Sequence, residues 1–128
     1  MTDELTFVDT FIVPNKRERF REKLPNRKHR KKAIQELAHF RHFDPRWQTP
    51  ISTTFDLELI LRRKGAPDHC HAISEDIRID GKTLPLAEAL QSIIGYGMAT
   101  VLICIPDRLA YYEGEGPSER YLLEKTST

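Results

Sequence analysis

The most chemically versatile side chains of the sequence stand together in the tetrapeptide Asp68-His69-Cys70-His71. On a β-strand, His69 and His71 project from the same face, as a pair of zinc-binding imidazoles must. A third and a fourth ligand would have to come from the adjacent Asp68 or from residues earlier in the chain, namely His39, His42 or Asp44. Their spacing matches no standard metal motif, so we predict no bound metal or other cofactor and keep the two histidines as the metal candidates.

Cys70 is also a candidate nucleophile, because a neighbouring imidazole can hold a thiol in its reactive thiolate form. Alternate residues of a strand face opposite ways, so the adjacent histidines would not supply that base. Cys104 lies in the most apolar run of the chain, which is typical of a packed core thiol. The sequence therefore favours a non-enzymatic protein. A small enzyme that uses Cys70, His69 and His71 is an alternative.

Two further motifs have structural explanations. Gly95-Tyr96-Gly97 follows a predicted helix and precedes a predicted strand, whereas a phosphate-binding glycine loop follows a strand and begins a helix. These glycines therefore favour a helix end. Glu75 and Asp76 follow a predicted strand, where adjacent acids are more often solvated than catalytic.

The basic residues are concentrated in one segment. The whole chain has a net charge of +1, but residues 14–47 contain twelve Lys or Arg and four Asp or Glu. A segment with a net charge of +8 repels itself unless an anion lies nearby. That anion could be a nucleic-acid backbone, an acidic protein, or the acidic residues 48–128 of the same chain.

We therefore predict a binding module that contacts nucleic acid or another polyanion through its basic N-terminal helices, without base specificity. The alternative is a protein-interaction or inhibitor module with an acidic partner and aromatic anchors, among which an outward-facing tyrosine of a strand at residues 109–113 is a candidate. The candidate binding residues are Lys16, Arg17, Arg21, Arg27, Lys28, Arg30, Lys31, Lys32, Trp47, Tyr111 and Tyr112. The sequence does not define an oligomeric state.

The composition is that of a globular protein, with 128 residues of which 39% are hydrophobic and 30% charged. Two cysteines are too few for a disulfide scaffold, so we expect a cytoplasmic protein. The first 13 residues carry three acids and no base, unlike a signal peptide. No apolar run approaches the roughly 18 residues of a membrane span, so we expect no membrane contact.

Hydrophobic periodicity predicts a strand over residues 5–13 and helices over 15–24 and 27–43, with Asn15 and Asn26 as their N-caps. Residues 45–52 are expected to form a connector. Residues 53–64 alternate as a strand does, but acids near their start and Arg62, Arg63 and Lys64 at their end favour a helix. Residues 120–124 are expected to form an edge strand.

The C-terminal part predicts strands over 70–74, 99–105 and 109–113, with a helix after Pro85. Residues 101–105 are apolar without interruption, which is typical of a central strand covered on both faces. We expect an α/β or α+β fold with a small mixed sheet of three to four strands, including a parallel crossover over residues 70–105. Residues 1–128 would form one domain, with a basic helical arm at 14–43 and a sheet-containing core at 68–125.

Overall fold

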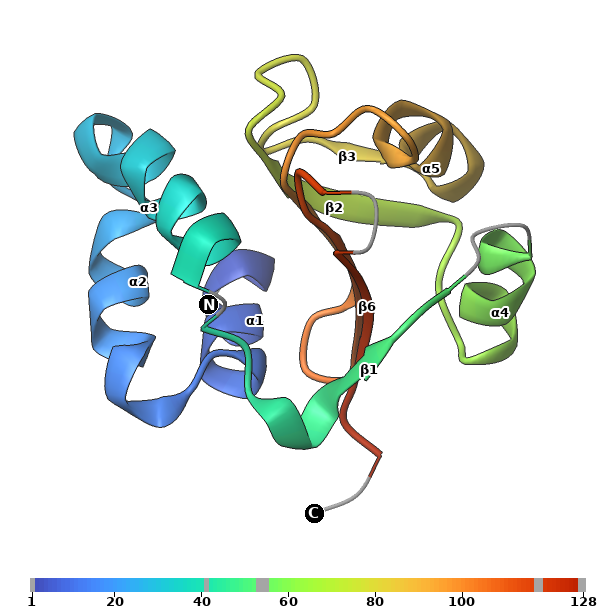
Figure 1. Ribbon diagram of the computed structural model, residues 1–128, viewed down its shortest axis with the longest axis horizontal. Coiled ribbons are helices and arrows are strands. Elements are labelled where there is room, and N and C mark those ends of the chain that lie inside the picture. Colours follow the sequence, from blue (N-terminus) through green and yellow to red (C-terminus); the bar gives the residue numbers. More distant parts are fainter. Residues whose placement is uncertain (1, 41, 53–55, 117–118, 127–128) are drawn as a thin grey trace.

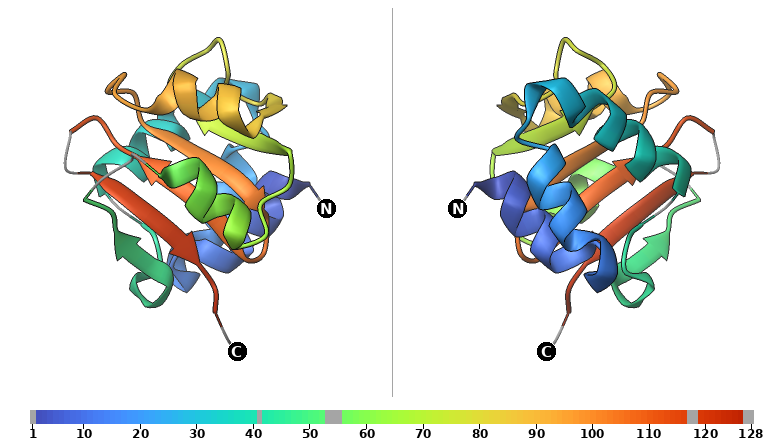
Figure 2. Two further views of the ribbon diagram at one scale, coloured as in Figure 1. Left: turned by 90° about the vertical axis from the view of Figure 1, so that its right-hand side faces the viewer. Right: turned by 90° about the vertical axis from the view of Figure 1, so that its left-hand side faces the viewer.

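The computed structural model describes residues 2–40, 42–52, 56–116 and 119–126, and all of their side chains except those of residues 38–40. A six-stranded sheet lies between two layers of helices, as Figures 1 and 2 show. Three N-terminal helices cover one face of the sheet, and two later helices cover the other. Among the described residues, no helix has the length and apolar character that crossing a membrane requires.

The sheet has the strand order β1-β6-β5-β4-β2-β3, and every neighbouring pair is antiparallel. Its strands are β1 Gln48–Pro50, β2 His69–Ser74, β3 Thr83–Pro85, β4 Thr100–Ile105, β5 Leu109–Glu113 and β6 Arg120–Glu124. The prediction of three to four strands was too low, because the connector at 45–52 contributes β1 and the turn after Gly81 contributes β3. The α/β class itself is confirmed.

The predicted parallel crossover over residues 70–105 is wrong. The chain turns at Asp80-Gly81, and Gly81 has the positive φ of 74° that this turn requires. β3 therefore returns antiparallel to β2, and α5 (Leu86–Ile93) carries the chain to the other side of β2, where β4 also pairs antiparallel. The helix thus connects β3 to β4 across β2. β6 is also not an edge strand, because β1 pairs with its outer side.

The predicted strand at residues 5–13 is instead the helix α1 (Asp3–Phe11). The hydroxyl of Thr2 accepts a hydrogen bond from the backbone N–H of Leu5 at 3.2 Å and caps the helix. Phe7 and Phe11 are one helical turn apart, with ring centroids separated by 5.3 Å. A spacing of four residues places two side chains on the same face of either a strand or a helix. Val8 is buried together with its neighbour Phe7, as on the apolar face of a helix, whereas adjacent residues of a strand point to opposite faces.

Two more helices and two short 3-10 turns complete the N-terminal layer: η1 Pro14–Lys16, α2 Arg17–Lys23, α3 Arg27–Phe40 and η2 Pro45–Trp47. Asn26 caps α3 as predicted, because its side-chain oxygen accepts the backbone N–H of Lys28 at 2.9 Å. Asn15 does not cap α2. It lies inside η1, and Lys16 stands at the N-cap of α2.

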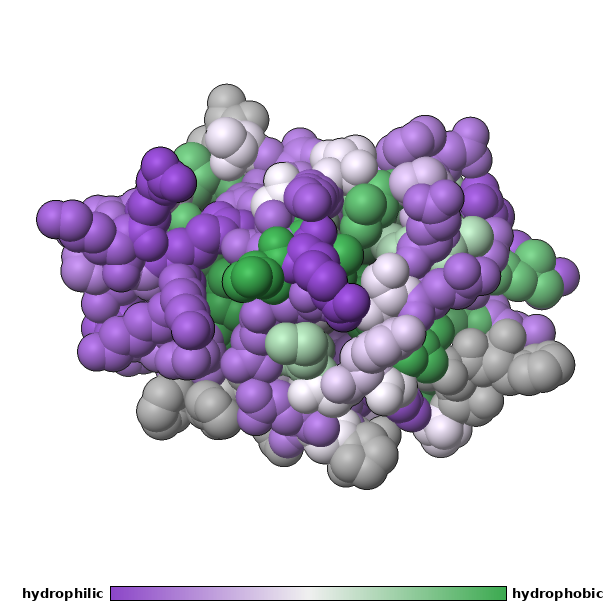
Figure 3. Space-filling view, turned by 90° about the horizontal axis from the view of Figure 1, so that it is seen from above, coloured by the Kyte–Doolittle hydropathy of each residue, from purple (hydrophilic) through white to green (hydrophobic). Residues whose placement is uncertain are grey.

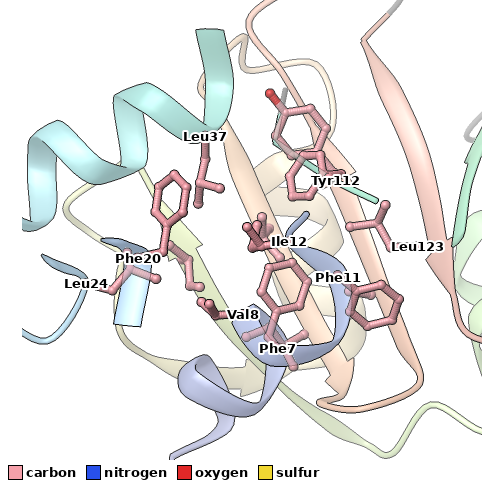
Figure 4. Close-up of a cluster of buried hydrophobic side chains, with 14 of the residues drawn as sticks. Phe7, Val8, Phe11, Ile12, Phe20, Leu24, Leu37, Tyr112 and Leu123 are labelled. Atoms are coloured by element: carbon pink, nitrogen blue, oxygen red, sulfur yellow. The ribbon is translucent and has the colours of Figure 1, made fainter. Parts of the chain in front are cut away.

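The core beneath this layer is rich in aromatic rings. Phe7, Phe11 and Phe20 are fully buried, and Phe43 packs against Tyr112 of β5 with 4.8 Å between the ring centroids. Figure 4 shows the rings of Phe7, Phe11, Phe20 and Tyr112 together with Leu37 of α3 and Leu123 of β6, between the helices and the sheet. The basic helices are therefore packed onto the sheet, and burial of their apolar side chains holds them there.

The opposite face is covered by α4 (Leu57–Arg63) and α5 (Leu86–Ile93). The helix favoured for residues 53–64 is thus found at 57–63, and residues 53–55 lie outside the described part. The glycines after these helices adopt positive φ, 103° at Gly65 and 84° at Gly95. β4 is an interior strand with side chains buried on both faces, as its unbroken apolar sequence predicts.

Candidate functional site

The three arginines of α2 have hydrogen-bond or ion-pair partners inside the protein. Arg17 donates from Nε to the carbonyl oxygen of Ile12 at 2.8 Å. Arg21 lies 3.0 Å from a carboxylate oxygen of Asp9 on α1. Arg19 pairs with Glu36 of α3 at 2.6 Å. Of the predicted binding residues, Arg17 and Arg21 therefore fasten neighbouring helices together.

Arg30 of α3 is engaged still more completely. Its guanidinium donates to both oxygens of Glu4, at 2.6 and 2.8 Å, and to both oxygens of Asp80, at 2.8 and 2.9 Å. A fifth hydrogen bond reaches the carbonyl oxygen of Leu24 at 3.0 Å. An arginine has five N–H donors, so all the donors of Arg30, one of the predicted binding residues, are used within the molecule in this arrangement.

Charge pairing at Arg30 also fixes the ionisation of Glu4. Burial opposes the charged form of Glu4, but hydrogen bonds from Arg30 and His71 outweigh it and lower the pKa of Glu4 to about 2. The same carboxylates hold the pKa of Arg30 above its ordinary range. This group of four side chains, Glu4, Arg30, His71 and Asp80, joins α1, α3 and the sheet. We call it the Arg30 network.

The two metal candidates, His69 and His71, lie on β2 in different environments. His71 contacts Glu4 through Nε2 at 2.7 Å and Thr83 through Nδ1 at 3.3 Å, whereas His69 is exposed. The side chain of His39 lies outside the described residues. Among the residues whose placement is described, no group of three or more His, Cys, Asp or Glu is arranged to hold a metal ion.

The two cysteines belong to the apolar layer under α4 and α5, on the face opposite the Arg30 network. Both are free thiols and both are buried. A hydrogen bond with Cys70, together with burial, raises the pKa of the Cys104 thiol well above its ordinary value. Cys70 is thus held in the core and separated from the ring of His71, an arrangement that supports a packing role.

The adjacent acids Glu75 and Asp76 stabilise the backbone and side chains around them. Glu75 accepts the backbone N–H of Ala99 at 2.8 Å. Asp76 is buried and pairs with Arg78 at 2.9 Å, which lowers the pKa of Asp76. Both acids therefore have structural partners at this end of β2.

Both tyrosines predicted as anchors are buried. Tyr111 is fully buried, and its hydroxyl donates to Glu113 at 2.7 Å; Tyr112 is only 2% exposed. The expectation of an outward-facing ring is wrong because helices cover both faces of β5. Trp47 is half-buried, with the guanidinium of Arg46 5.1 Å from its ring centroid.

The first two turns of α3 carry the exposed part of the basic block. Arg27, Lys28, Lys31 and Lys32 are all exposed, and within the described ranges of the chain none of them forms an ion pair. We call these four residues the α3 basic surface. They form two stripes of i and i+4 neighbours, Arg27 with Lys31 and Lys28 with Lys32.

A cleft of about 600 Å³ lies beside this surface, between α3 and the loops at one end of the sheet. Arg27, Lys31 and Ile34 line it from α3, and Ile77, Met98 and Glu115 line it from the loops. Figure 3, which views the molecule from above, shows apolar surface in the middle of this face with hydrophilic surface around it. Sequence reasoning missed this cleft because its loop residues come from three separate turns.

The loops at this cleft also hold exposed apolar side chains. Ile77 is 86% exposed, Tyr96 is 60% exposed and Met98 is 36% exposed. They are three of the four large hydrophobic side chains that are exposed in the described part of the chain; Leu59 on α4 is the fourth. The sequence contains an indication of this exposed group. Ile77 stands between two charged residues, Asp76 and Arg78, in a turn, where its side chain has no buried face to pack against.

The fold and the site together define an α+β protein with a helix-covered antiparallel sheet, an exposed basic helix and an apolar cleft beside it. Comparison of the chain with protein-family models, curated proteins and solved structures found no match.

Proposed function

We propose that this protein is a binding module whose α3 basic surface contacts the phosphate backbone of a nucleic acid without reading its bases. The observation that carries the proposal is the difference between α2 and α3. The arginines of α2 have hydrogen-bond or ion-pair partners in the same molecule. Arg27, Lys28, Lys31 and Lys32 are exposed and form no ion pair within the described part of the chain, and Lys32 acts on Glu36 only through its charge. Four neighbouring exposed cations attract the phosphates of a nucleic acid, and this attraction does not depend on the base sequence.

The position of these cations in the helix supports the same conclusion. The first turn of α3 contains no acidic residue, although the start of a helix carries a partial positive charge. Four cations in the first two turns therefore repel both one another and the helix dipole. A bound anion relieves both repulsions, and this makes the arrangement more favourable in a complex than in the free protein.

The proposal is tested by titrating a fluorescently labelled oligonucleotide with the protein at salt concentrations from about 50 to about 200 mM. Four phosphate contacts give a plot of log K against log salt with a slope of about −2.8 for a single strand and about −3.6 for a duplex, so binding weakens roughly 50- to 150-fold over this range. Two oligonucleotides of unrelated sequence should bind equally. Binding that does not respond to salt, or no binding at about 50 mM salt, contradicts the proposal.

A charge-reversal variant locates the contact. Lys28→Glu/Lys32→Glu alters the stripe of the α3 basic surface that does not line the cleft, and we expect at least about a tenfold loss of affinity. The matched control is Arg63→Glu/Arg108→Glu, which changes the net charge equally at two exposed positions on α4 and the β4–β5 turn. Equal losses in both variants would show that net charge acts without a defined surface.

A second candidate function, a protein-interaction module, is favoured by the exposed Ile77, Tyr96 and Met98. Exposed apolar side chains gathered in one place mark interaction surfaces more often than scattered ones do. A protein that stays bound after nuclease treatment, and is released by Ile77→Asp, would support this candidate. Loss of all bound material on nuclease treatment would favour the phosphate contact.

A further inference from the structure

The cleft beside α3 has opposite charges on its two sides. Arg27 and Lys31 stand on the α3 side, and Glu75 and Glu115 stand on the loop side. Ile34, Ile77 and Met98 supply the apolar part of the lining. Arg30 and Asp80 also line the cleft, with one positive and one negative charge, and they pair with each other at 2.8 Å. The cleft is thus balanced in charge, which distinguishes it from the outer stripe of Lys28 and Lys32.

This balance restricts what can occupy the cleft. A nucleic acid or a uniformly acidic segment would be attracted by the α3 side and repelled by Glu75 and Glu115. A suitable partner has an apolar centre, with negative charge to face α3 and positive charge to face the loops. The same face of a second copy of this chain has that distribution.

We propose that the cleft and the exposed side chains around it form the interface of a homodimer. When a two-fold axis runs along the apolar part of the cleft, the α3 side of each copy faces the loop side of the other. Lys31 of one protomer then approaches Glu115 of its partner, and the reciprocal contact forms by symmetry. The two apolar parts meet across the axis, where their removal from water drives association.

The exposed Ile77 completes the fit. It stands on the turn between β2 and β3 and has 86% of its surface exposed, so its own chain hardly covers it. The cleft, at about 600 Å³, is large enough to receive such a side chain from a second copy. Reciprocal insertion of Ile77, with Tyr96 and Met98 beside it, would bury most of the exposed apolar side chains of the described molecule. This interface does not require nucleic acid. It uses Arg27 and Lys31, so in the dimer the phosphate contact is left to Lys28 and Lys32 of each protomer, which lie outside the cleft and together supply four cations.

Light scattering during size-exclusion chromatography, with the full chain at up to about 100 µM, measures the mass directly. We expect twice the mass of one chain. Ile77→Asp should weaken association at least about tenfold, because it introduces a charge into the apolar centre without removing a buried contact. Leu59→Asp, which alters the exposed apolar residue on α4, is the matched control and should leave the dimer intact.

A monomeric wild-type protein at this concentration would overturn the proposal. So would a dimer that Ile77→Asp leaves unchanged, because the interface would then lie elsewhere. Circular dichroism of each variant confirms that the chain is folded, so a loss of mass reports association alone.

A charge swap tests the pairing of the two sides. Lys31→Glu alone places like charges opposite Glu115, and Glu115→Lys alone places like charges opposite Lys31, so each variant should be monomeric. A mixture of the two variants restores opposite charges at both symmetry-related contacts and should form a heterodimer. Dimers of either single variant, or a mixture that stays monomeric, would contradict the proposed arrangement of the two copies.

Discussion

The two helical layers are attached to the sheet by different interactions. Beneath α1, α2 and α3, aromatic packing is accompanied by the Arg30 network, which joins residues as far apart in sequence as Glu4, Arg30 and Asp80. Beneath α4 and α5, the contacts are mainly between aliphatic side chains and the two cysteines. The first attachment therefore depends on ionisation, and the second depends mainly on burial of apolar surface.

The two helical layers can be compared through one arginine in each. Arg30 pairs with Glu4 and Asp80, and Arg62 of α4 pairs with Glu58 and Asp68. The Arg30 side chain is 21% exposed and bridges distant parts of the chain. The Arg62 side chain is 39% exposed, and its partners are four and six residues away. Each arginine pairs with two carboxylates, but the ion pairs of Arg30 should therefore contribute much more to stability than those of Arg62.

The largest effect is expected for Arg30→Met, which keeps the aliphatic stem and removes the charge. Glu4 and Asp80 would then be partly buried carboxylates that have lost their main cation, and breaking such a pair typically costs about 3 to 5 kcal/mol. Urea denaturation at neutral pH measures this loss of unfolding free energy. A loss no larger than that of an exposed ion pair would show that the network does not hold the N-terminal layer.

A smaller effect is expected on acidification. The pKa of Glu4 is lowered from 4.5 to about 2, so its contribution is complete above pH 5 and is lost as the pH falls from about 5 towards 2. This shift corresponds to about 3 kcal/mol at neutral pH. In urea denaturation, Glu4→Gln should be less stable than the wild type at pH 7, and the two should converge near pH 2. A constant difference between them across this range would exclude ionisation of Glu4 as the cause.

The smallest effect is expected for Arg62→Met. Its ion pairs with Glu58 and Asp68 are exposed to solvent and connect residues that are already close in sequence. The urea midpoint of Arg62→Met should therefore stay close to that of the wild type. The small difference between the two midpoints should stay small when salt is added. An effect equal to that of Arg30→Met would remove the distinction between the two layers.

Local patterns predicted most of the C-terminal elements. The apolar run at residues 101–105 predicts a central strand, and Gly65 and Gly95 mark the ends of the helices before them. Which strands pair with one another depends on tertiary packing, and a local sequence pattern carries no information about it. This is why the antiparallel pairing of β2 with β4 and the inclusion of β1 were missed.

The candidate site was predicted in part, for a related reason. The sequence identifies the basic block, and the structure shows which cations have partners within the described chain. Arg30 and Lys31 are adjacent basic residues, and the sequence alone does not tell which of them has partners. In the fold only Arg30 lies opposite Glu4 and Asp80, which come from distant elements. The cleft was missed because Ile77, Met98 and Glu115 belong to three loops that only the folded sheet brings together.

The two outermost strands have a further consequence. β1 and β3 are each three residues long, and each ends in a proline, Pro50 and Pro85 respectively. A proline has no backbone N–H to donate, and a strand this short offers few hydrogen-bonding groups to an incoming chain. Both borders of the sheet are therefore poor templates for fibril growth, which protects the protein from aggregation through its backbone.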